Sequence, residues 1–187
     1  MSEPTSTPLP RSQRRVVPFR IREARLSDLD AAARVRAACW RESFTGLVPD
    51  EVLANADAWA PRVAEAWASS MLERGASYWL AVDEHGQIVG VAHADAAFEP
   101  DAPAPLELKT LYLLDRAKGS GVAAALVHRA IGDEVPAYLW VIEGNERAIG
   151  FYERIGFRRD GAVRAIRPGW PGGRQVRMVR RPAVDPD

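Results

Sequence analysis

The chain has 187 residues, and its 25 Lys and Arg side chains balance 25 Asp and Glu side chains, so its formal net charge is 0. That length suits one domain with its own core and is short for two. A neutral chain lacks the electrostatic attraction that general binding to nucleic acids or to anionic membranes needs, so we expect neither as a partner.

Cysteine and histidine usage narrows the chemistry further. Cys39 is the only cysteine, so we expect no internal disulfide. The histidines His85, His93 and His128 lie far from Cys39 and from one another in sequence, and this spacing predicts no metal site. Neither a run of 18 apolar residues nor a signal-type segment after the first Met is present, which predicts a cytoplasmic location.

The two ends of the chain differ in composition from the part between them. Residues 1–18 are rich in Ser, Thr, Pro and Arg and have no apolar period, which predicts a disordered N-terminal tail. Residues 182–187 are expected to form a short C-terminal tail. The folded domain is therefore expected over residues 19–181.

The first half of this domain is predicted to hold two helices and a hairpin. Phe19–Arg22 alternates apolar and polar residues, as a half-buried strand does. Ser27–Trp40 begins with a capping-box pattern and places apolar residues on one helical face. Trp59–Met71 carries large apolar side chains at i+4 steps, which predicts a second helix. Tyr78–Val82 and Gln87–His93 flank a turn and predict an antiparallel hairpin.

The central stretch runs from Leu106 to Ile131 and reads as a strand, a glycine-bearing turn and a helix. Leu106–Leu113 suits a largely buried strand, and the helix that follows the turn has apolar residues at i, i+3, i+4 and i+7. The turn contains Gly119 and Gly121. Glycines allow positive φ and close approach of a ligand, and the free N–H groups at a helix start attract anions, so this turn is a candidate phosphate site.

The remaining elements complete a mixed sheet. Pro136–Ile142 is predicted to be a strand that follows a right-handed crossover and lies parallel to its neighbour. Asn145–Ile155 is predicted to be a helix with Asn145 as its N-cap. Phe157–Gly161 and Arg174–Arg180 are expected to close the sheet, joined by a segment that includes the loop Pro168–Gly173. About seven strands and four helices result.

The glycine turn has more than one interpretation. A Walker loop requires G-x-x-x-x-G-K-[ST], and no such string occurs. The dinucleotide fingerprint G-x-G-x-x-G/A does match Gly119–Ala124, with Glu143 about 20 residues further on. Against it, that fingerprint normally follows the first strand of a doubly wound sheet, whereas hairpin-like strands precede it here. A dinucleotide-binding domain therefore stays as a less favoured alternative.

Three ordered motifs carry a resemblance to a known family. Lys118–Ala123 is similar to the R/Q-x-x-G-x-G/A signature of the GNAT superfamily of acyl-CoA-dependent N-acetyltransferases, and Asn145–Phe157 resembles its N-x-x-A-x-x-F-Y-x-x-x-G-F segment. Trp40–Pro49 is similar to the W-R-x-x-Y-x-G-x-x-P stretch of many small bacterial members. The departures are Phe44 for Tyr, Lys118 for Arg or Gln, and Ala123 for Gly.

The resemblance implies an α/β (α+β) fold with a mostly antiparallel sheet and a central pair of parallel strands that splay apart. Here these strands are Glu107–Leu113 and Tyr138–Ile142, and the pantetheine arm of acetyl-CoA is expected between them. The cofactor-binding residues implied are Leu111, Tyr112, Leu113, Lys118, Gly119, Ser120, Gly121, Val122, Ala123, Asn145 and Tyr152. The backbone of the first three is expected to pair with pantetheine, and the glycine turn to hold the pyrophosphate.

The resemblance also implies two catalytic residues. Tyr152 corresponds to the tyrosine that protonates the departing thiolate, and Glu107 is similar to the carboxylate that some members use as a general base. An alkyl amine has a pKa near ~10.4, so it must lose a proton before it attacks the thioester. Strand alternation predicts Glu107 on the same face as Leu111 and Leu113. The expected reaction is direct transfer of an acetyl group to a primary amine, without a covalent enzyme intermediate or a metal.

The sequence is compatible with a second function and does not identify the acceptor. A protein that binds acyl-CoA without catalysis, such as a sensor, is the alternative function. The acceptor is expected to be a small-molecule or peptide amine, but its pocket would be built from the divergent segments Trp40–Trp67 and Phe98–Pro105, which do not identify it. Many relatives form dimers, which leaves a homodimer open.

Overall fold

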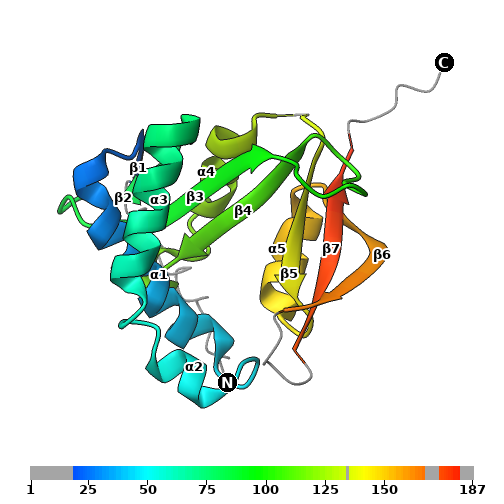
Figure 1. Ribbon diagram of the computed structural model, residues 1–187, viewed down its shortest axis with the longest axis horizontal. Coiled ribbons are helices and arrows are strands. Elements are labelled where there is room, and N and C mark those ends of the chain that lie inside the picture. The colour runs from blue at the N-terminus through cyan, green and yellow to red at the C-terminus, as the bar shows by residue number, and fades with distance from the viewer. Residues whose placement is uncertain (1–18, 134, 167–172, 182–187) are drawn as a thin grey trace, which may run out of the picture.

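The computed structural model describes residues 19–133, 135–166 and 173–181. The predicted tails, residues 1–18 and 182–187, and nearly all of the predicted loop 168–173 lie outside these residues. The described residues form one sheet with helices on both faces. In Figure 1, α1 and α3 lie in front of the sheet and α4 and α5 lie behind it.

The sheet has seven strands in the order β1-β2-β3-β4-β5-β7-β6, which confirms the predicted number and the mixed character. Every neighbouring pair is antiparallel except β4 and β5, which are parallel. The predicted bounds of the central strand and of the last strand are confirmed. The strands are β1 (Arg20–Glu23), β2 (Trp79–Val82), β3 (Ile88–Ala96), β4 (Leu106–Leu113), β5 (Ala137–Ile142), β6 (Arg158–Ala165) and β7 (Arg174–Arg180).

The described residues contain five α-helices rather than the four expected. They are α1 (Leu29–Phe44), α2 (Asp50–Ala54), α3 (Ala60–Arg74), α4 (Val122–Ile131) and α5 (Glu146–Arg154), with two short 3-10 helices, η1 (Leu26–Asp28) and η2 (Asp115–Ala117). The helix that the sequence missed is α2, because five residues are too few to show a 3.6-residue period.

The capping box predicted at the start of the first helix is wrong. Helix α1 begins at Leu29, after Asp28, and no side chain caps it. The Asp28 carboxylate instead accepts two hydrogen bonds from the Arg22 guanidinium, at 2.7 and 2.8 Å, and one from the backbone N–H of Arg25 at 2.7 Å. Asp28 is the third residue of η1, and its bond from the Arg25 N–H forms a capping box there, so the box belongs to η1 and not to the start of α1. The hydrogen bonds from Arg22 lower the pKa of Asp28 to about 2.

Two apolar layers cover the sheet, one on each face. Helices α1 and α3 bury Leu80 and Val91 of the central strands, together with Trp67 of α3 itself. Helix α4 buries Leu113 on the opposite face, and α5 packs against Leu139. Because side chains alternate along a strand, each strand supplies both layers.

A bulge in β4 reverses the predicted placement of Glu107. His93 of β3 pairs with Thr110 and the next residue, Ala94, pairs with Leu108, so Lys109 is an extra residue in β4. An extra residue shifts the alternation of side chains by one. Glu107 therefore lies on the face of Thr110, toward α1 and α3, and not on the face of Leu111 and Leu113 as predicted.

The parallel pair splays apart as expected. The pairing of β4 with β5 consists of Leu106 with Ala137 and Glu107 with Tyr138, at the first residues of both strands. Beyond this point β4 pairs with β3 and β5 pairs with β7, and the two strands diverge, as Figure 1 shows. The backbone edges that face each other across the gap can therefore accept an extended ligand in the manner of an added strand.

Candidate functional site

The glycine turn lies between η2 and α4, at the end of β4 where the sheet is splayed. Gly119 has φ of 79° and Gly121, which precedes the first residue of α4, has φ of 88°. Within the described part of the chain, the backbone N–H groups of Gly119, Ser120, Gly121 and Ala123 have no hydrogen-bond acceptor. Several free N–H donors at a helix start form a concave site for an anion such as a phosphate.

Lys118 joins this turn to the end of α1. Its ammonium group donates to Ser43 Oγ at 2.8 Å and to Asp115 Oδ1 at 2.5 Å. The backbone N–H of Asp115 donates to Glu42 Oε2 at 2.8 Å. The hydrogen bond from Lys118 lowers the pKa of Asp115, so that carboxylate stays charged and already balances the lysine. The backbone N–H groups, more than Lys118, are thus the donors that remain for an anion.

Asn145 and Tyr152 lie on the far side of the gap, on α5. Asn145 caps α5, as predicted, because its Oδ1 accepts from the Ala148 N–H at 3.1 Å, and its amide NH₂ group stays available. Tyr152 is buried beside the rings of Phe151 and Phe157, at centroid distances of 5.3 and 5.9 Å. Burial, and to a lesser degree Tyr112, raises the pKa of Tyr152, so its hydroxyl is protonated at neutral pH.

Glu107 is held at the closed end of the gap, on the opposite face from Tyr152. Its Oε2 accepts from Lys109 Nζ at 2.9 Å and from the Tyr138 hydroxyl at 3.4 Å. Only 9% of the residue is exposed. Burial, together with the charge of Glu107, raises the pKa of Tyr138, which therefore stays a neutral donor. Glu107 and Tyr152 thus lie on opposite faces of the sheet.

His93 shares a face with Glu107 but is occupied structurally. Its ring stacks on Tyr78 at 4.2 Å, and its Nδ1 lies 2.9 Å from the Ser77 carbonyl oxygen, which requires the proton on Nδ1. Burial lowers the pKa of His93, so the neutral form is favoured. The Nε2 atom lies 3.9 Å from Asp95 Oδ2, too far for a hydrogen bond.

Sequence reasoning did not single out Arg36, which the fold brings to the same face. Its guanidinium carbon lies 4.3 Å from the centre of the Trp40 ring and 5.5 Å from that of the Tyr112 ring. The i,i+4 spacing of Arg36 and Trp40 could have indicated a shared helical face. The contact with Tyr112 joins residues far apart in sequence and could not have been read from spacing.

The loop between β3 and β4 is tied to the C-terminal strands by charged groups. Glu99 accepts from Trp140 Nε1 at 3.2 Å and forms an ion pair with Arg164. Asp101 accepts from Arg177 at 3.0 Å, and this arginine also bonds Asp160 at 2.8 Å. The loop is therefore held against β5, β6 and β7 by these contacts.

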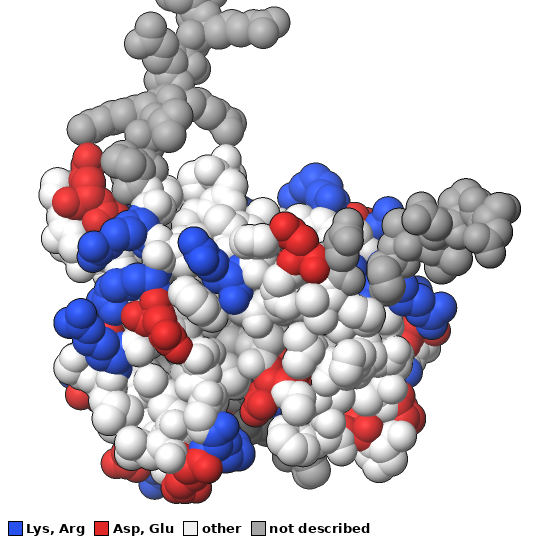
Figure 2. Space-filling model, turned by 90° about the horizontal axis from the view of Figure 1, so that it is seen from above, with Lys and Arg blue, Asp and Glu red and all other residues white. Residues whose placement is uncertain are grey.

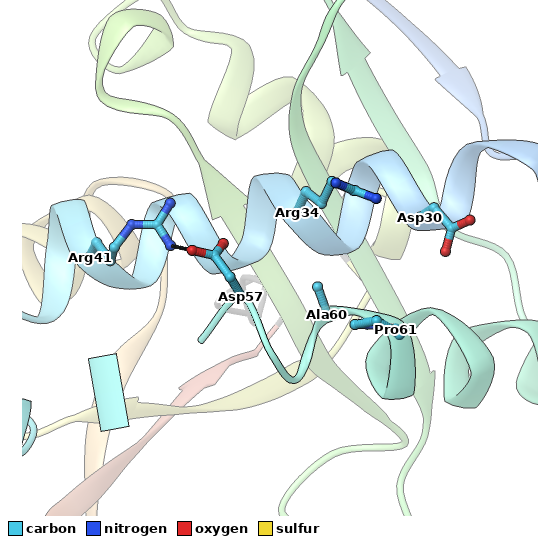
Figure 3. A pocket seen from close by; sticks show the side chains of 6 residues that line it. All are labelled: Asp30, Arg34, Arg41, Asp57, Ala60 and Pro61. Carbon is cyan, nitrogen blue, oxygen red and sulfur yellow. Dashed lines mark hydrogen bonds and ion pairs between the residues drawn. The ribbon is translucent and has the colours of Figure 1, made fainter. Parts of the chain in front are cut away.

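A groove of about 400 Å³ lies elsewhere, between α1 and the start of α3. The ion pair of Arg41 and Asp57, at 2.6 Å, crosses it, and Asp30 and Arg34 lie further along α1 (Figure 3). Arg34 and Arg36 are about 200° apart around the helix. This groove is therefore on the outer side of α1 and is separate from the gap between β4 and β5.

Charged side chains of both signs are mixed on the surface. Figure 2 shows basic and acidic side chains interspersed around a largely uncharged area. Among residues 19–133, 135–166 and 173–181, no group of His, Cys, Asp and Glu is placed to hold a metal ion. No helix within these ranges is long and apolar enough to cross a membrane.

Comparison with known proteins agrees with this geometry. The model of the acetyltransferase (GNAT) family matches residues 36–157, which is more than half of the chain. A probable N-acetyltransferase of Mycobacterium tuberculosis is 30% identical over 154 residues, which are 80% of this chain and 86% of that protein. A peptidyl-lysine N-acetyltransferase of Escherichia coli is 34% identical over 92 residues, 46% of this chain and 52% of that protein.

Solved structures share the fold. The PaiA N-acetyltransferase of Thermoplasma acidophilum, in complex with coenzyme A, superposes with a TM-score of 0.68 at 17% identity, over 88% of this chain and 99% of that one. The apo form of YjaB from Escherichia coli gives a TM-score of 0.62 at 21% identity, over 89% and 99%. A doubly wound dinucleotide fold is excluded, because the described sheet is antiparallel except for one pair. The chain belongs to the acetyltransferase (GNAT) family.

Proposed function

We propose that the protein transfers an acetyl group from acetyl-CoA to a primary amine by direct attack within a ternary complex. The observation that carries this proposal is the gap between β4 and β5, which opens beyond Glu107 and Tyr138 and leads to the free N–H groups of the glycine turn. An extended arm ending in phosphates matches a slot ending in an anion site. We also assign the protein to the cytoplasm, which suits its free thiol Cys39.

The residues of the turn fit the pyrophosphate of coenzyme A. A Cβ built on Gly119 or Gly121 meets no atom within 4 Å, so the turn is open above its backbone. The N–H groups of the turn would hold the phosphates, with those of Val122 and Ala123 at the helix start. The backbone of Leu111, Tyr112 and Leu113 would pair with pantetheine along the unpaired edge of β4, and the amide of Asn145 would bond the arm from the other side.

The proposed base, Glu107, and the proposed acid, Tyr152, come from opposite faces of the sheet. Glu107 lies on the face of α1 and α3, and Tyr152 lies on the face of α5. An amine approaching from the first face would give a proton to Glu107, directly or through water, and then attack the thioester carbonyl. The sulfur departs toward the second face, where the Tyr152 hydroxyl supplies a proton. The balance is one ammonium ion and one acetyl-CoA giving one amide, one CoA thiol and one proton.

Proximity contributes much of the expected acceleration. Two substrates held in one gap react as if at very high concentration, which lowers the barrier without covalent chemistry. Backbone N–H groups along β4 would stabilise the oxyanion of the tetrahedral intermediate. In this proposal the glycine turn binds the phosphates, the strands orient the two substrates, and Glu107 and Tyr152 transfer protons.

The direct test is titration of the pure protein with acetyl-CoA, followed by a thiol-release assay over a panel of amines. We expect saturable binding, a melting temperature that rises with acetyl-CoA concentration, and CoA production with at least one amine. A rise in melting temperature with no CoA production over the panel would instead favour a non-catalytic acyl-CoA sensor. No binding at all would contradict both functions.

The Gly121→Ala variant tests the turn. Gly121 has φ of 88°, so alanine there costs about 1–2 kcal/mol and turns the adjacent N–H groups away. We expect the Kd for acetyl-CoA to increase about 10-fold. Gly86→Ala is the matched control, because Gly86 has φ of 77° in the β2–β3 turn and a Cβ there also meets no atom. Equal effects of both variants on the Kd would remove the turn from the cofactor site.

A further inference from the structure

Arg36 carries a charge that no acidic group in the described chain balances. Its Nη1 atom is buried and has no hydrogen-bond partner among residues 19–133, 135–166 and 173–181. None of the ion pairs of the described residues includes Arg36. Among the residues that the structure describes, the groups in contact with the guanidinium are the faces of Trp40 and Tyr112.

Such an arrangement is costly for a purely structural residue. A buried donor without an acceptor loses its hydration, and the cost is larger for a charged group. Aromatic faces attract the charge of a guanidinium but leave the hydrogens in its plane without acceptors. Arg36 as a whole is only partly buried, but its Nη1 atom is buried, and a buried guanidinium nitrogen normally meets a carboxylate or another acceptor. Two rings that fix an unpaired guanidinium instead prepare it for an anion that arrives with a ligand.

Arg36 lies on the face of the sheet from which the acceptor amine would approach. Tyr112 lies on the same face of β4 as Thr110 and Glu107, because Val91, His93 and Asp95 of β3 pair with these three residues. That is the face from which, under the proposed function, the amine approaches. Arg36 thus stands over the splayed part of β4, while Glu107 lies at its closed end.

The phosphates of acetyl-CoA are a poor match for this cation. The turn that would hold them contacts α1 through Lys118 and Ser43. Ser43 is about 10 Å further along the axis of α1 than Arg36. The turn also has its own donors, whereas the guanidinium faces the amine side of the sheet. A carboxylate on the acceptor is the anion that the position favours.

We propose that Arg36 binds a carboxylate of the acceptor, so that the protein acetylates amines that also carry an acidic group, such as amino acids. This inference rests on the proposed function. The planar guanidinium matches a carboxylate through two parallel hydrogen bonds, which a lysine cannot provide. Because Glu107 lies five residues before Tyr112 on β4, roughly 15 Å along the strand, a short zwitterion bound at Arg36 would pass its amine proton to Glu107 through water.

The test compares acids with their amides as acceptors. The twenty protein amino acids, β-alanine, γ-aminobutyrate and ε-aminocaproate are each assayed beside the matching carboxamide, at saturating acetyl-CoA, by thiol release. Wild-type protein should favour the acids. Arg36→Met should raise KM for the acids about 10- to 100-fold, with kcat and the amide KM values little changed. Arg36→Lys should fall between the two.

Two further measurements exclude a structural or cofactor role. Arg36→Met replaces an unpaired charge by an apolar chain of similar length, so the melting temperature should not fall. The Kd for acetyl-CoA should also be unchanged. Arg34→Met is the matched control, since Arg34 lies on the outer side of the same helix and should affect neither acids nor amides.

Several outcomes would overturn the inference. One is an Arg36→Met effect that is equal for acids and amides, and another is weaker binding of acetyl-CoA, which would assign the guanidinium to the phosphates. Calorimetry with the acids tests binding without turnover, and no saturable binding by any acid would also refute it. Turnover of amides without preference for acids would leave the proposed function standing, whereas no binding of acetyl-CoA and no thiol release would refute that function itself.

Discussion

The Tyr152→Phe variant is expected to lower kcat for thiol release by about 100-fold and to leave the Kd for acetyl-CoA nearly unchanged. Phenylalanine keeps the ring that packs between Phe151 and Phe157, so the shape of the gap is preserved. The variant removes only the hydroxyl, and no hydrogen bond of that hydroxyl to the described residues is lost. A fall in kcat without a change in binding therefore reports on proton donation to the sulfur.

The raised pKa of Tyr152 sets the pH range of this effect. Burial favours the neutral phenol, so the group stays protonated to a higher pH than an ordinary tyrosine. Ionisation of Tyr152 should thus cause no loss of kcat up to pH ~10, the ordinary value. The difference between wild type and variant should persist across that range, and a difference that disappears at neutral pH would contradict the assignment.

Tyr78→Phe is the control for the general effect of removing a buried phenol. Tyr78 is 3% exposed, and its hydroxyl lies 3.0 Å from Ser70 Oγ, on the side of the sheet where α3 packs. Its loss should reduce stability by about 1 kcal/mol and leave kcat unchanged. If both variants lose activity equally, the cause is altered packing. If neither does, Tyr152 is not the acid.

The strands were the most predictable part of the fold. Strand β4 begins directly after Pro105 and β7 begins directly after Gly173, so a residue that is rare within strands marks the start of each. Helix α2 was missed because it is short, and the cap of α1 was wrong because Arg22, on another element, bonds Asp28. The errors thus arise where a residue from elsewhere in the chain decides the local conformation.

Some residues of the candidate site could be predicted from the sequence, and others could not. The residues of the glycine turn and Asn145 follow from contiguous motifs, and the crossover from β4 through α4 to its parallel neighbour β5 brings these motifs together. The face of Glu107 could not be predicted, because nothing in the strand pattern marks Lys109 as an extra residue. The contact of Arg36 with Tyr112 depends on how α1 crosses the sheet.

Replacement of Glu107, the proposed general base, is also expected to reduce activity strongly. The Glu107→Gln variant is expected to lower kcat/KM at pH 7 by about 100-fold, because an amine with a pKa near ~10.4 must lose a proton before attack and glutamine cannot accept it. The side chain is of equal size, and its carbonyl oxygen can still accept from the Tyr138 hydroxyl and from Lys109. The fold and the gap should therefore persist, with a melting temperature close to that of wild type.

The pH profile separates a base from a binding charge. As pH rises toward the pKa of the amine, solvent removes the proton that Glu107 would have taken, so the variant should recover toward wild-type activity. A loss of binding alone would raise KM equally at every pH.

Asp95→Asn is the matched control, since Asp95 pairs with Glu107 across the sheet on the same face and is more exposed. Its effect on kcat/KM should be small, about threefold or less. A Glu107→Gln variant that is as active as wild type at pH 7 would show that the amine loses its proton by another route.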